Sequence, residues 1–259
     1  MFGLDGFVTA YGAAALLGSF AALAAGGFTK GVVGFALPLV ALSTLGSFLP
    51  FEVAVALLIV PTLISNLFQA TRNGLEAAWG SLKRFWRLNL VLVGMIAVSA
   101  QLVVVLPDAL LFGLLGALVT AFGISQILGW RPGFPAARKN LVEVLVALAG
   151  GFIGGLSGIW GPPVVMYLLA AEVPKIEMVR VQALCFLLGS VVLLFAHLHS
   201  GLLNQVTLPA SAWLVLPTIL GLFIGYRVQD RLDQALFRRV TLIVLVVAGL
   251  NLLRRAFFG

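Results

Sequence analysis

Long apolar stretches without a charged residue dominate this chain of 259 residues and constrain its fold more than any other feature. A helix that crosses the hydrocarbon layer of a membrane needs about 20 largely apolar residues. Uncharged stretches of about that length recur at 6–29, 31–51, 53–71, 88–107, 109–130, 144–171 and 181–226. The last is long enough for two spans, with a turn expected near Gly201 and Asn204. We therefore predict an all-α polytopic membrane protein.

The composition excludes several other classes of protein. Charged residues make up only 10% of the chain, whereas a soluble domain carries roughly a quarter. The strict alternation of apolar and polar residues that marks outer-membrane barrels is absent. The single cysteine, Cys185, lies in an apolar stretch and cannot form a disulfide or a redox pair within the chain. We expect a lipid bilayer as the surroundings, with no cofactor, no metal site and no nucleic-acid partner.

Most basic residues gather in four clusters between the apolar stretches. These clusters are Arg72, Lys83, Arg84 and Arg87; Arg131, Arg138 and Lys139; Lys175 and Arg180; and Arg227, Arg231, Arg238 and Arg239. Cytoplasmic loops carry an excess of Lys and Arg, so we predict that all four clusters are cytoplasmic. Arg254 and Arg255 then fall on the outer side as an exception. The expected location is the cell inner membrane, with multiple passes.

An internal repeat divides the chain into two halves. Residues 26–38 read GGFTKGVVGFALP and residues 150–162 read GGFIGGLSGIWGP. At a constant offset of 124, the identical pairs are Gly26/Gly150, Gly27/Gly151, Phe28/Phe152, Gly31/Gly155, Gly34/Gly158, Pro38/Pro162 and, further on, Pro50/Pro174. Abundant glycine explains part of this match, but the ungapped register favours a duplication.

The charge map and the repeat together predict two inverted halves. Residues 8–48 begin and end outside and residues 141–171 begin and end inside, so each is expected to be a helical hairpin broken at its Gly/Pro motif. Three spans follow each hairpin, at about 52–71, 88–106 and 109–128 in the first repeat and at about 181–198, 207–226 and 240–255 in the second. The expected divisions are a first repeat at 1–128, a basic cytoplasmic linker at 129–140 and a second repeat at 141–259.

Five passes per half is an odd number, so the second copy is expected to lie upside down relative to the first. Inverted repeats with interrupted helices at matching positions are typical of secondary transporters. A plain count of long hydrophobic stretches gives about eight helices instead.

The two Gly/Pro motifs are the strongest functional signal. Glycine permits backbone conformations that other residues avoid, and a proline is well placed in the first turn of the next helix. Two such helix starts would direct unpaired N–H groups and positive dipole ends at one point, which suits an anion. The alternative is that the glycines serve close helix packing, because Gly27–Gly31 and Gly151–Gly155 have the small-xxx-small spacing.

Polar residues inside the apolar stretches are further candidates. Lys30 is an intramembrane cation that would attract an anion, or else a lysine whose amine reaches the interface. Asn66 and Gln69 lie three residues apart on one helix face, and Arg72 continues that spacing. We favour a positive-inside anchor over a functional role for Arg72.

The second half offers its own polar candidates. Ser157 and Trp160 lie within the motif, and Gln182 lies on the next span. We expect Trp160 to form a wall or gate of the site. Glu143 is either a proton-coupling group or a carboxylate favoured by a helix N-terminus.

The motifs GGFTKGVVGFALPLVAL and GGFIGGLSGIWGPPVVMYLL resemble the paired motifs of the TauE/SafE family of sulfite exporter-like membrane proteins. The resemblance covers essentially the whole chain and implies movement of small anions such as sulfite and organosulfonates. It assigns binding roles to the matching motif positions, which are Gly31, Gly34, Pro38, Gly155, Ser157, Gly158, Gly161 and Pro162.

The sequence thus predicts a secondary anion transporter and no enzymatic activity, with export favoured by the family resemblance. Its expected partners are a small anion, a coupling proton or sodium ion, and a second copy of the chain in a homodimer. An intramembrane enzyme and a non-transporting scaffold subunit are the alternatives. The enzyme would need a nucleophile with a base or a metal-ligand set, and the sequence shows neither.

Overall fold

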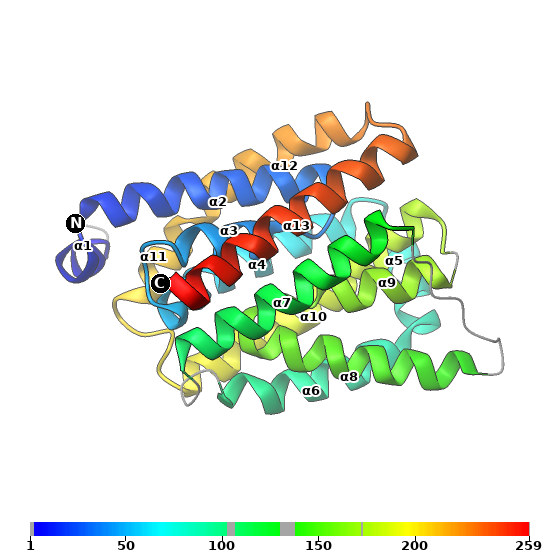
Figure 1. Ribbon diagram of the computed structural model, residues 1–259, viewed down its shortest axis with the longest axis horizontal. Coiled ribbons are helices and arrows are strands. Elements are labelled where there is room, and N and C mark those ends of the chain that lie inside the picture. The colour runs from blue at the N-terminus through cyan, green and yellow to red at the C-terminus, as the bar shows by residue number, and fades with distance from the viewer. Residues whose placement is uncertain (1–2, 103–106, 130–137, 172, 259) are drawn as a thin grey trace.

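The computed structural model describes residues 3–102, 107–129, 138–171 and 173–258, and every regular element in these ranges is a helix (Figure 1). The first half contains α1 (Asp5–Tyr11), α2 (Ala13–Val33), α3 (Leu37–Leu45), α4 (Phe51–Thr71), α5 (Leu75–Arg84), α6 (Trp86–Ser99), the 3-10 turn Ala100–Leu102 and α7 (Asp108–Ile127). The second half contains α8 (Lys139–Ser157), α9 (Gly161–Ala170), α10 (Lys175–His199), α11 (Thr207–Trp213), α12 (Val215–Gln229) and α13 (Gln234–Phe258). The all-α prediction is confirmed.

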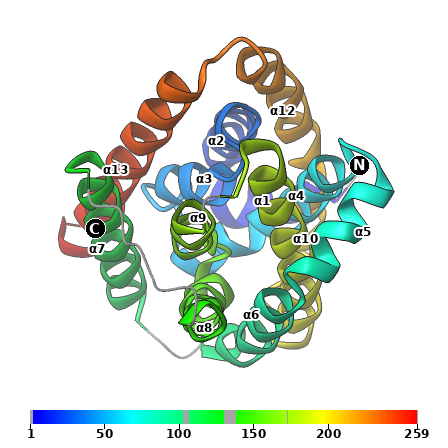
Figure 2. The same cartoon turned by 90° about the vertical axis from the view of Figure 1, so that its right-hand side faces the viewer.

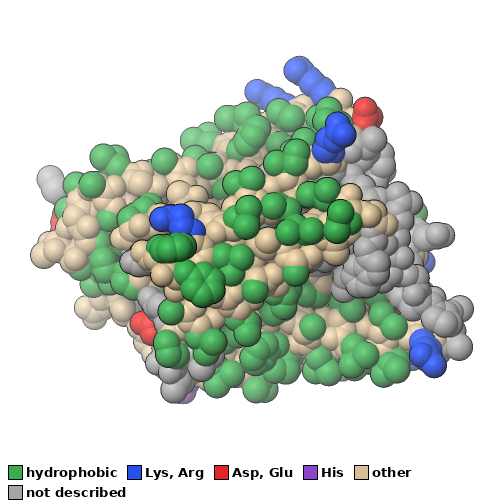
Figure 3. Space-filling view, viewed as in Figure 1, with side chains coloured by type: hydrophobic (Ala, Val, Ile, Leu, Met, Phe, Trp, Pro, Cys, Tyr) green, Lys and Arg blue, Asp and Glu red, His purple; other side chains and the backbone are tan. Residues whose placement is uncertain are grey.

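Several of these helices are long and apolar enough to cross a membrane. Five pass by length and composition, and a sixth is added if the bent pair Leu75–Arg84 and Trp86–Leu102, with an angle of 81° between its parts, counts as one span. Large apolar side chains also cover the outer surface (Figure 3). Leu220 and Val247, for example, are 67% and 62% exposed. Soluble proteins rarely expose so much apolar surface, because its contact with water is unfavourable. The chain is therefore a multi-pass membrane protein.

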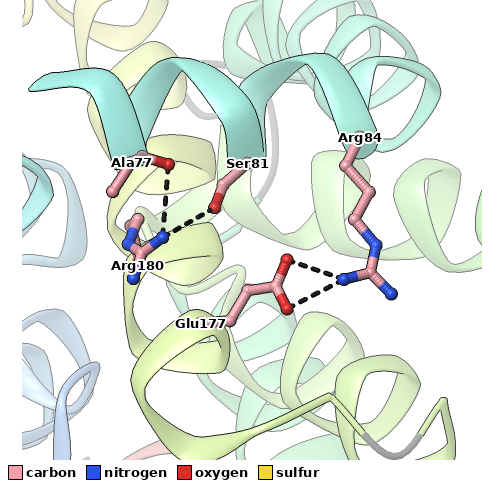
Figure 4. Close-up of polar contacts among 5 residues, drawn as sticks. All are labelled: Ala77, Ser81, Arg84, Glu177 and Arg180. Carbon is pink, nitrogen blue, oxygen red and sulfur yellow. Dashed lines mark hydrogen bonds and ion pairs between the residues drawn. The ribbon is translucent and has the colours of Figure 1, made fainter.

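Helix α5 is an element that the sequence analysis did not predict. It carries Trp79, which is 58% exposed, next to the basic residue Lys83. An amphipathic helix with an exposed Trp and basic residues suits a membrane interface. Figure 4 shows how α5 is fixed to α10: Arg84 forms a 2.9 Å ion pair with Glu177, and Arg180 donates to the Ala77 carbonyl oxygen and the Ser81 hydroxyl.

The two short helices α3 and α9 lie inside a surround of longer helices, as the end-on view shows (Figure 2). Leu37, Leu42 and Leu45 of α3 are each 0% exposed, so this nine-residue helix contacts protein along most of its length. A helix of nine residues is only about 14 Å long. Short helices of this kind are stable at membrane depth when neighbouring helices cover their ends.

Glycines bring α2 against α12 and α8 against α6. A Cβ at Gly27 would lie 2.1 Å from the Thr218 carbonyl oxygen, and one at Gly31 would lie 2.3 Å from that of Leu222. In the other pair, a Cβ at Gly151 would lie 2.7 Å from the Leu92 carbonyl oxygen, and Gly155 lies beside the backbone of Ile96. Residue numbers rise together across each contact, so both helix pairs are parallel.

Helices α4 and α10 pack against each other and run antiparallel. Near the end of α4, Arg72 shares a pocket with Ile176 at the start of α10. Further back along α4, the Asn66 side chain donates to the hydroxyl of Ser190, which lies further along α10. These two helices carry polar groups of the candidate site.

The glycine contacts give a first testable prediction. Replacing Gly31 with Ala places a methyl group within 2.3 Å of the α12 backbone, where only a shift of the whole helix relieves the clash. We expect a loss of about 1–3 kcal/mol in the free energy of unfolding and a lower melting temperature in detergent.

The matched control is Gly94→Ala in α6, because a Cβ at Gly94 meets nothing within 4 Å. Its melting temperature should stay the same or rise, since alanine favours a helix over glycine by about 1 kcal/mol. Equal melting temperatures for the two variants would contradict this account of the helix contacts.

Candidate functional site

Each half contains a helix that ends on a left-handed glycine. Gly34 ends α2 with φ +94°, and Gly158 ends α8 with φ +71°. The Gly34 N–H donates to the Lys30 carbonyl oxygen and the Gly158 N–H donates to that of Gly154, each at 2.7 Å. Only glycine adopts this conformation readily, so these two positions fix where the helices stop.

The break therefore falls in the last part of each Gly/Pro motif. The sequence analysis treated the whole motif as a crossover, but Gly26–Val33 and Gly150–Ser157 are helical. Pro38 and Pro162 occupy the second positions of α3 and α9. A proline in the first helical turn loses no hydrogen bond there and leaves the neighbouring N–H groups at the helix start.

The two turns pack against each other in the interior. Phe35, Pro38 and Leu39 from the first turn face Gly158, Ile159, Trp160 and Gly161 from the second, around a cavity of about 10 Å³. A cavity of that size holds about one water molecule. A Cβ at Gly161 would lie 2.8 Å from the Phe35 ring, so the absence of a side chain at Gly161 allows this close approach.

Lys30 lies one helical turn before Gly34 and is 1% exposed. Its ammonium group donates to the Ser65 hydroxyl at 3.1 Å and to the Asn66 side-chain oxygen. Both acceptors are neutral, and the ion pairs found in the described part of the chain join other residues. Lys30 is therefore a buried amine whose hydrogen-bond partners in the described part of the chain are all neutral.

The polar contacts continue from Lys30 along α4 and across to α10. Asn66 donates to the Ser190 hydroxyl at 3.0 Å, and the Gln69 amide donates to the Gly34 carbonyl oxygen at 2.6 Å. Within the described residues, three buried side-chain oxygens of this region have no hydrogen-bond partner: those of Thr62, Gln69 and Gln182. The network thus joins the first turn, α4 and α10. The three unpaired oxygens could accept further hydrogen bonds.

The structure separates the predicted site residues into groups. Lys30, Asn66 and Gln69 form the polar network, while Gly34, Pro38, Gly158, Trp160 and Gly161 form the paired turns. Gly31 and Gly155 instead contact the backbones of α12 and α6, so the packing alternative describes their surroundings. Ser157 ends α8 and Pro162 lies in α9, whereas Gln182 is buried in α10.

The indole of Trp160 covers the position that corresponds to Lys30 in the repeat. A Cβ at Gly154 would lie 2.4 Å from the Trp160 ring, and the same ring lies 5.7 Å from that of Phe186. Lys30 in the first half is thus matched by a glycine beneath an aromatic ring in the second. Only one of the two turns is accompanied by a cation.

Sequence reasoning missed Ser65 and Ser190, which complete the network around Lys30 and Asn66. Serine is common in membrane helices, so neither residue stands out by type. The repeat itself contains a signal, because Ser190 lies 124 positions after Asn66, the same offset that aligns the two motifs.

Glu143 is buried beside the start of α6. Its carboxylate accepts the Leu88 N–H at 3.0 Å and the Tyr167 hydroxyl at 3.3 Å. Leu88 is the third residue of α6, where the N–H has no partner within its own helix. Of the two roles considered for Glu143, this geometry favours stabilisation of a helix N-terminus.

Apolar helices with buried polar groups and interrupted short helices place this chain among the multi-pass α-helical membrane proteins. The TauE/SafE sulfite exporter family matches residues 19–252, so the chain belongs to that family. The resemblance seen in the motifs is confirmed, and the family implies a membrane transporter of the sulfite exporter type and not an enzyme. Comparisons with curated proteins and with solved structures found no match.

The network around Lys30 gives a second prediction. Asn66→Leu removes the charge-assisted hydrogen bond to Lys30 and leaves the ammonium group with one fewer acceptor. We expect the free energy of unfolding to fall by about 1.5–3 kcal/mol, the range for a hydrogen bond to a charged group. The double variant Lys30→Met with Asn66→Leu should recover most of this loss, because no charge then remains to be stabilised.

Thermal unfolding of the wild type, both single variants and the double variant in detergent measures this coupling. Additive losses for the two substitutions would show that Lys30 and Asn66 do not depend on each other.

Proposed function

We propose that this protein is a secondary carrier of a small anion, sulfite or an organosulfonate, which binds beside Lys30 between the two turns. Export is the favoured direction, on the basis of the family. The observation that carries the proposal is the buried Lys30 ammonium group with only Ser65 and Asn66 as partners. A cation at such depth costs at least about 2.5 kcal/mol, which an anionic ligand would offset.

The two turns add further stabilisation for an anion. Helices α3 and α9 begin at Leu37 and Gly161, on either side of the shared cavity. The first N–H groups of a helix have no partner within it and carry a partial positive charge. Pro38, Pro162 and Pro163 have no N–H, so Leu37 and Leu39 in α3 and Gly161 in α9 are the donors at these helix starts. An anion between these helix starts would exchange its water for backbone donors and for Lys30.

Inverted repeats are the arrangement we propose for the two halves. Gly34 and Gly158 end their helices alike, and Asn66 and Ser190 contact each other although they are equivalent residues 124 positions apart. Equivalent residues touch where a two-fold axis passes between them. In Figure 1, α2 runs from left to right and α8 from right to left, as such an axis in the membrane plane requires.

We propose alternating access as the transport mechanism. The cavity between the turns has room for about one water molecule, so binding and release of a larger anion require the turns to separate. The glycine-packed pairs α2–α12 and α8–α6 are suited to move as rigid units against α4 and α10. In Figure 3 most visible Lys and Arg side chains gather at one end, which we assign to the cytoplasmic side of the inner membrane.

Uptake of [³⁵S]sulfite into proteoliposomes, with a panel of unlabelled sulfonates as competitors, tests the proposal. Lys30→Met should reduce the initial rate by roughly tenfold or more, because the loss of a buried charged contact is worth at least about 1.4 kcal/mol. The same variant should be as stable as the wild type or more stable, since it removes a buried charge.

The control is Lys83→Met, which removes a cation that lies over the exposed ring of Trp79 on α5. Its uptake should equal that of the wild type. If folded wild-type protein moves none of these anions, the transport proposal fails. A scaffold role instead predicts that substitutions damage folding and activity together, as for Gly155→Ala, and never activity alone.

A further inference from the structure

A second polar pocket lies next to the candidate site, at the junction of α4, α10 and α12. It has a volume of about 360 Å³ and is lined by Arg72, Asn73, Ile176, Val179, Gln229 and Asp230. We call it the Arg72 pocket. It has room for a small oxyanion together with several water molecules, unlike the cavity between the turns.

Three side chains at the C-terminal end of α12, Tyr226, Gln229 and the capping residue Asp230, hold the Arg72 guanidinium in this pocket. One nitrogen donates to the Gln229 side-chain oxygen at 2.7 Å, and another donates to the two Asp230 carboxylate oxygens at 2.9 and 3.2 Å. The guanidinium carbon lies 4.1 Å from the centre of the Tyr226 ring. A residue that served only as an interfacial anchor would extend into the lipid headgroups instead.

Gln229 provides an unused donor in the same place. Because Arg72 donates to its oxygen, the other end of the amide must be the NH₂ group. That nitrogen is buried and has no hydrogen-bond partner in the described part of the chain, and Gln229 is 6% exposed. Leaving such a donor unpaired is costly, so the Gln229 amide would gain from an acceptor that enters the pocket.

Asp230 occupies the position that an external anion would take. Its side chain is 64% exposed, so its carboxylate can turn into water at little cost. The guanidinium would then present its planar fork to an oxyanion, which Arg binds through two parallel hydrogen bonds.

The Arg72 pocket is separated from the candidate site by a single layer of side chains. Val179 lines the pocket and would lie 3.5 Å from a Cβ at Gly34. The Gly34 carbonyl oxygen in turn accepts the Gln69 amide, three residues before Arg72 on α4. An anion in this pocket is thus one layer of side chains away from the turn that follows Lys30.

We propose that the Arg72 pocket is a second anion-binding site, which captures a small oxyanion from the cytoplasm before it reaches Lys30. Arg72 and the Gln229 amide NH₂ bind the oxyanion in exchange for the Asp230 carboxylate. Arg72 is therefore a binding residue, whereas the sequence analysis favoured an anchor. The proposal rests on the proposed function for its ligand class and direction of use.

The test is [³⁵S]sulfite uptake into inside-out membrane vesicles, whose outer face is cytoplasmic, over a range of sulfite concentrations. Arg72→Gln should raise the half-saturating concentration about tenfold, the effect of losing one hydrogen bond to a charged group. Asp230→Asn should lower it, because the competing negative charge is gone. The maximal rate should change little in either variant.

Arg84→Gln is the matched control, since Arg84 forms an ion pair of the same 2.9 Å length with Glu177 and does not line the pocket. It should leave the half-saturating concentration unchanged. An unchanged half-saturating concentration in Arg72→Gln, or a lower maximal rate alone, would overturn the second site while the proposed function stands.

Equilibrium binding separates the two proposals if wild-type vesicles transport no sulfite. Purified Lys30→Met protein should still bind [³⁵S]sulfite at the Arg72 pocket, and the added Arg72→Gln substitution should abolish this binding. If only the proposed transport function is wrong, the Lys30→Met protein should still bind sulfite. Absence of binding to the Lys30→Met protein, with its size-exclusion profile intact, would overturn the second site.

Discussion

The buried ammonium group of Lys30 is the interaction on which the rest of this structure depends. It is held by Ser65 and Asn66, and Asn66 in turn contacts Ser190 on α10. Nothing in this set is negatively charged, so the protein itself offsets little of the cost of burying the cation. A membrane interior makes that cost larger than a water-filled site would. This cost is the reason why we propose that an anion from outside the chain binds here, in a protein of the TauE/SafE sulfite exporter family.

Glycine serves two different purposes around this cation. Gly27 and Gly31 allow α2 to lie directly on α12, which fixes the helix that carries Lys30. Gly34 then ends that helix in a left-handed conformation, so the chain turns back as α3 beside the charge. Gly158 does the same in the second half, and the two turns meet. Some glycines thus allow close helix packing and others end the helices. In the proposed carrier, the turns separate where they touch.

The sequence was sufficient for the all-α fold, because each span must satisfy its backbone hydrogen bonds internally and so shows as a long apolar run. Lys30 also stands out in the sequence as an isolated charge in such a run, and its side chain is buried in the structure. The sequence did not distinguish Gly31 from Gly34, since a glycine that packs against a helix and a glycine that ends one look alike in it. The partner of Gly31 lies about 190 positions away at Leu222, and no local pattern reports such a contact. Helix α5 was missed because its basic residues interrupt the apolar pattern used to find helices.

Counterflow in proteoliposomes tests the central claim most directly. Vesicles containing purified protein are loaded with unlabelled sulfite and diluted into a trace of [³⁵S]sulfite. A carrier whose anion site beside Lys30 alternates between the two faces exchanges labelled for unlabelled anion, so the label should accumulate transiently above its equilibrium level. Lys30→Met vesicles should take up the label with an initial rate lower by roughly tenfold or more. Wild-type vesicles that lack the overshoot, or Lys30→Met vesicles that match the wild-type initial rate, would contradict the account.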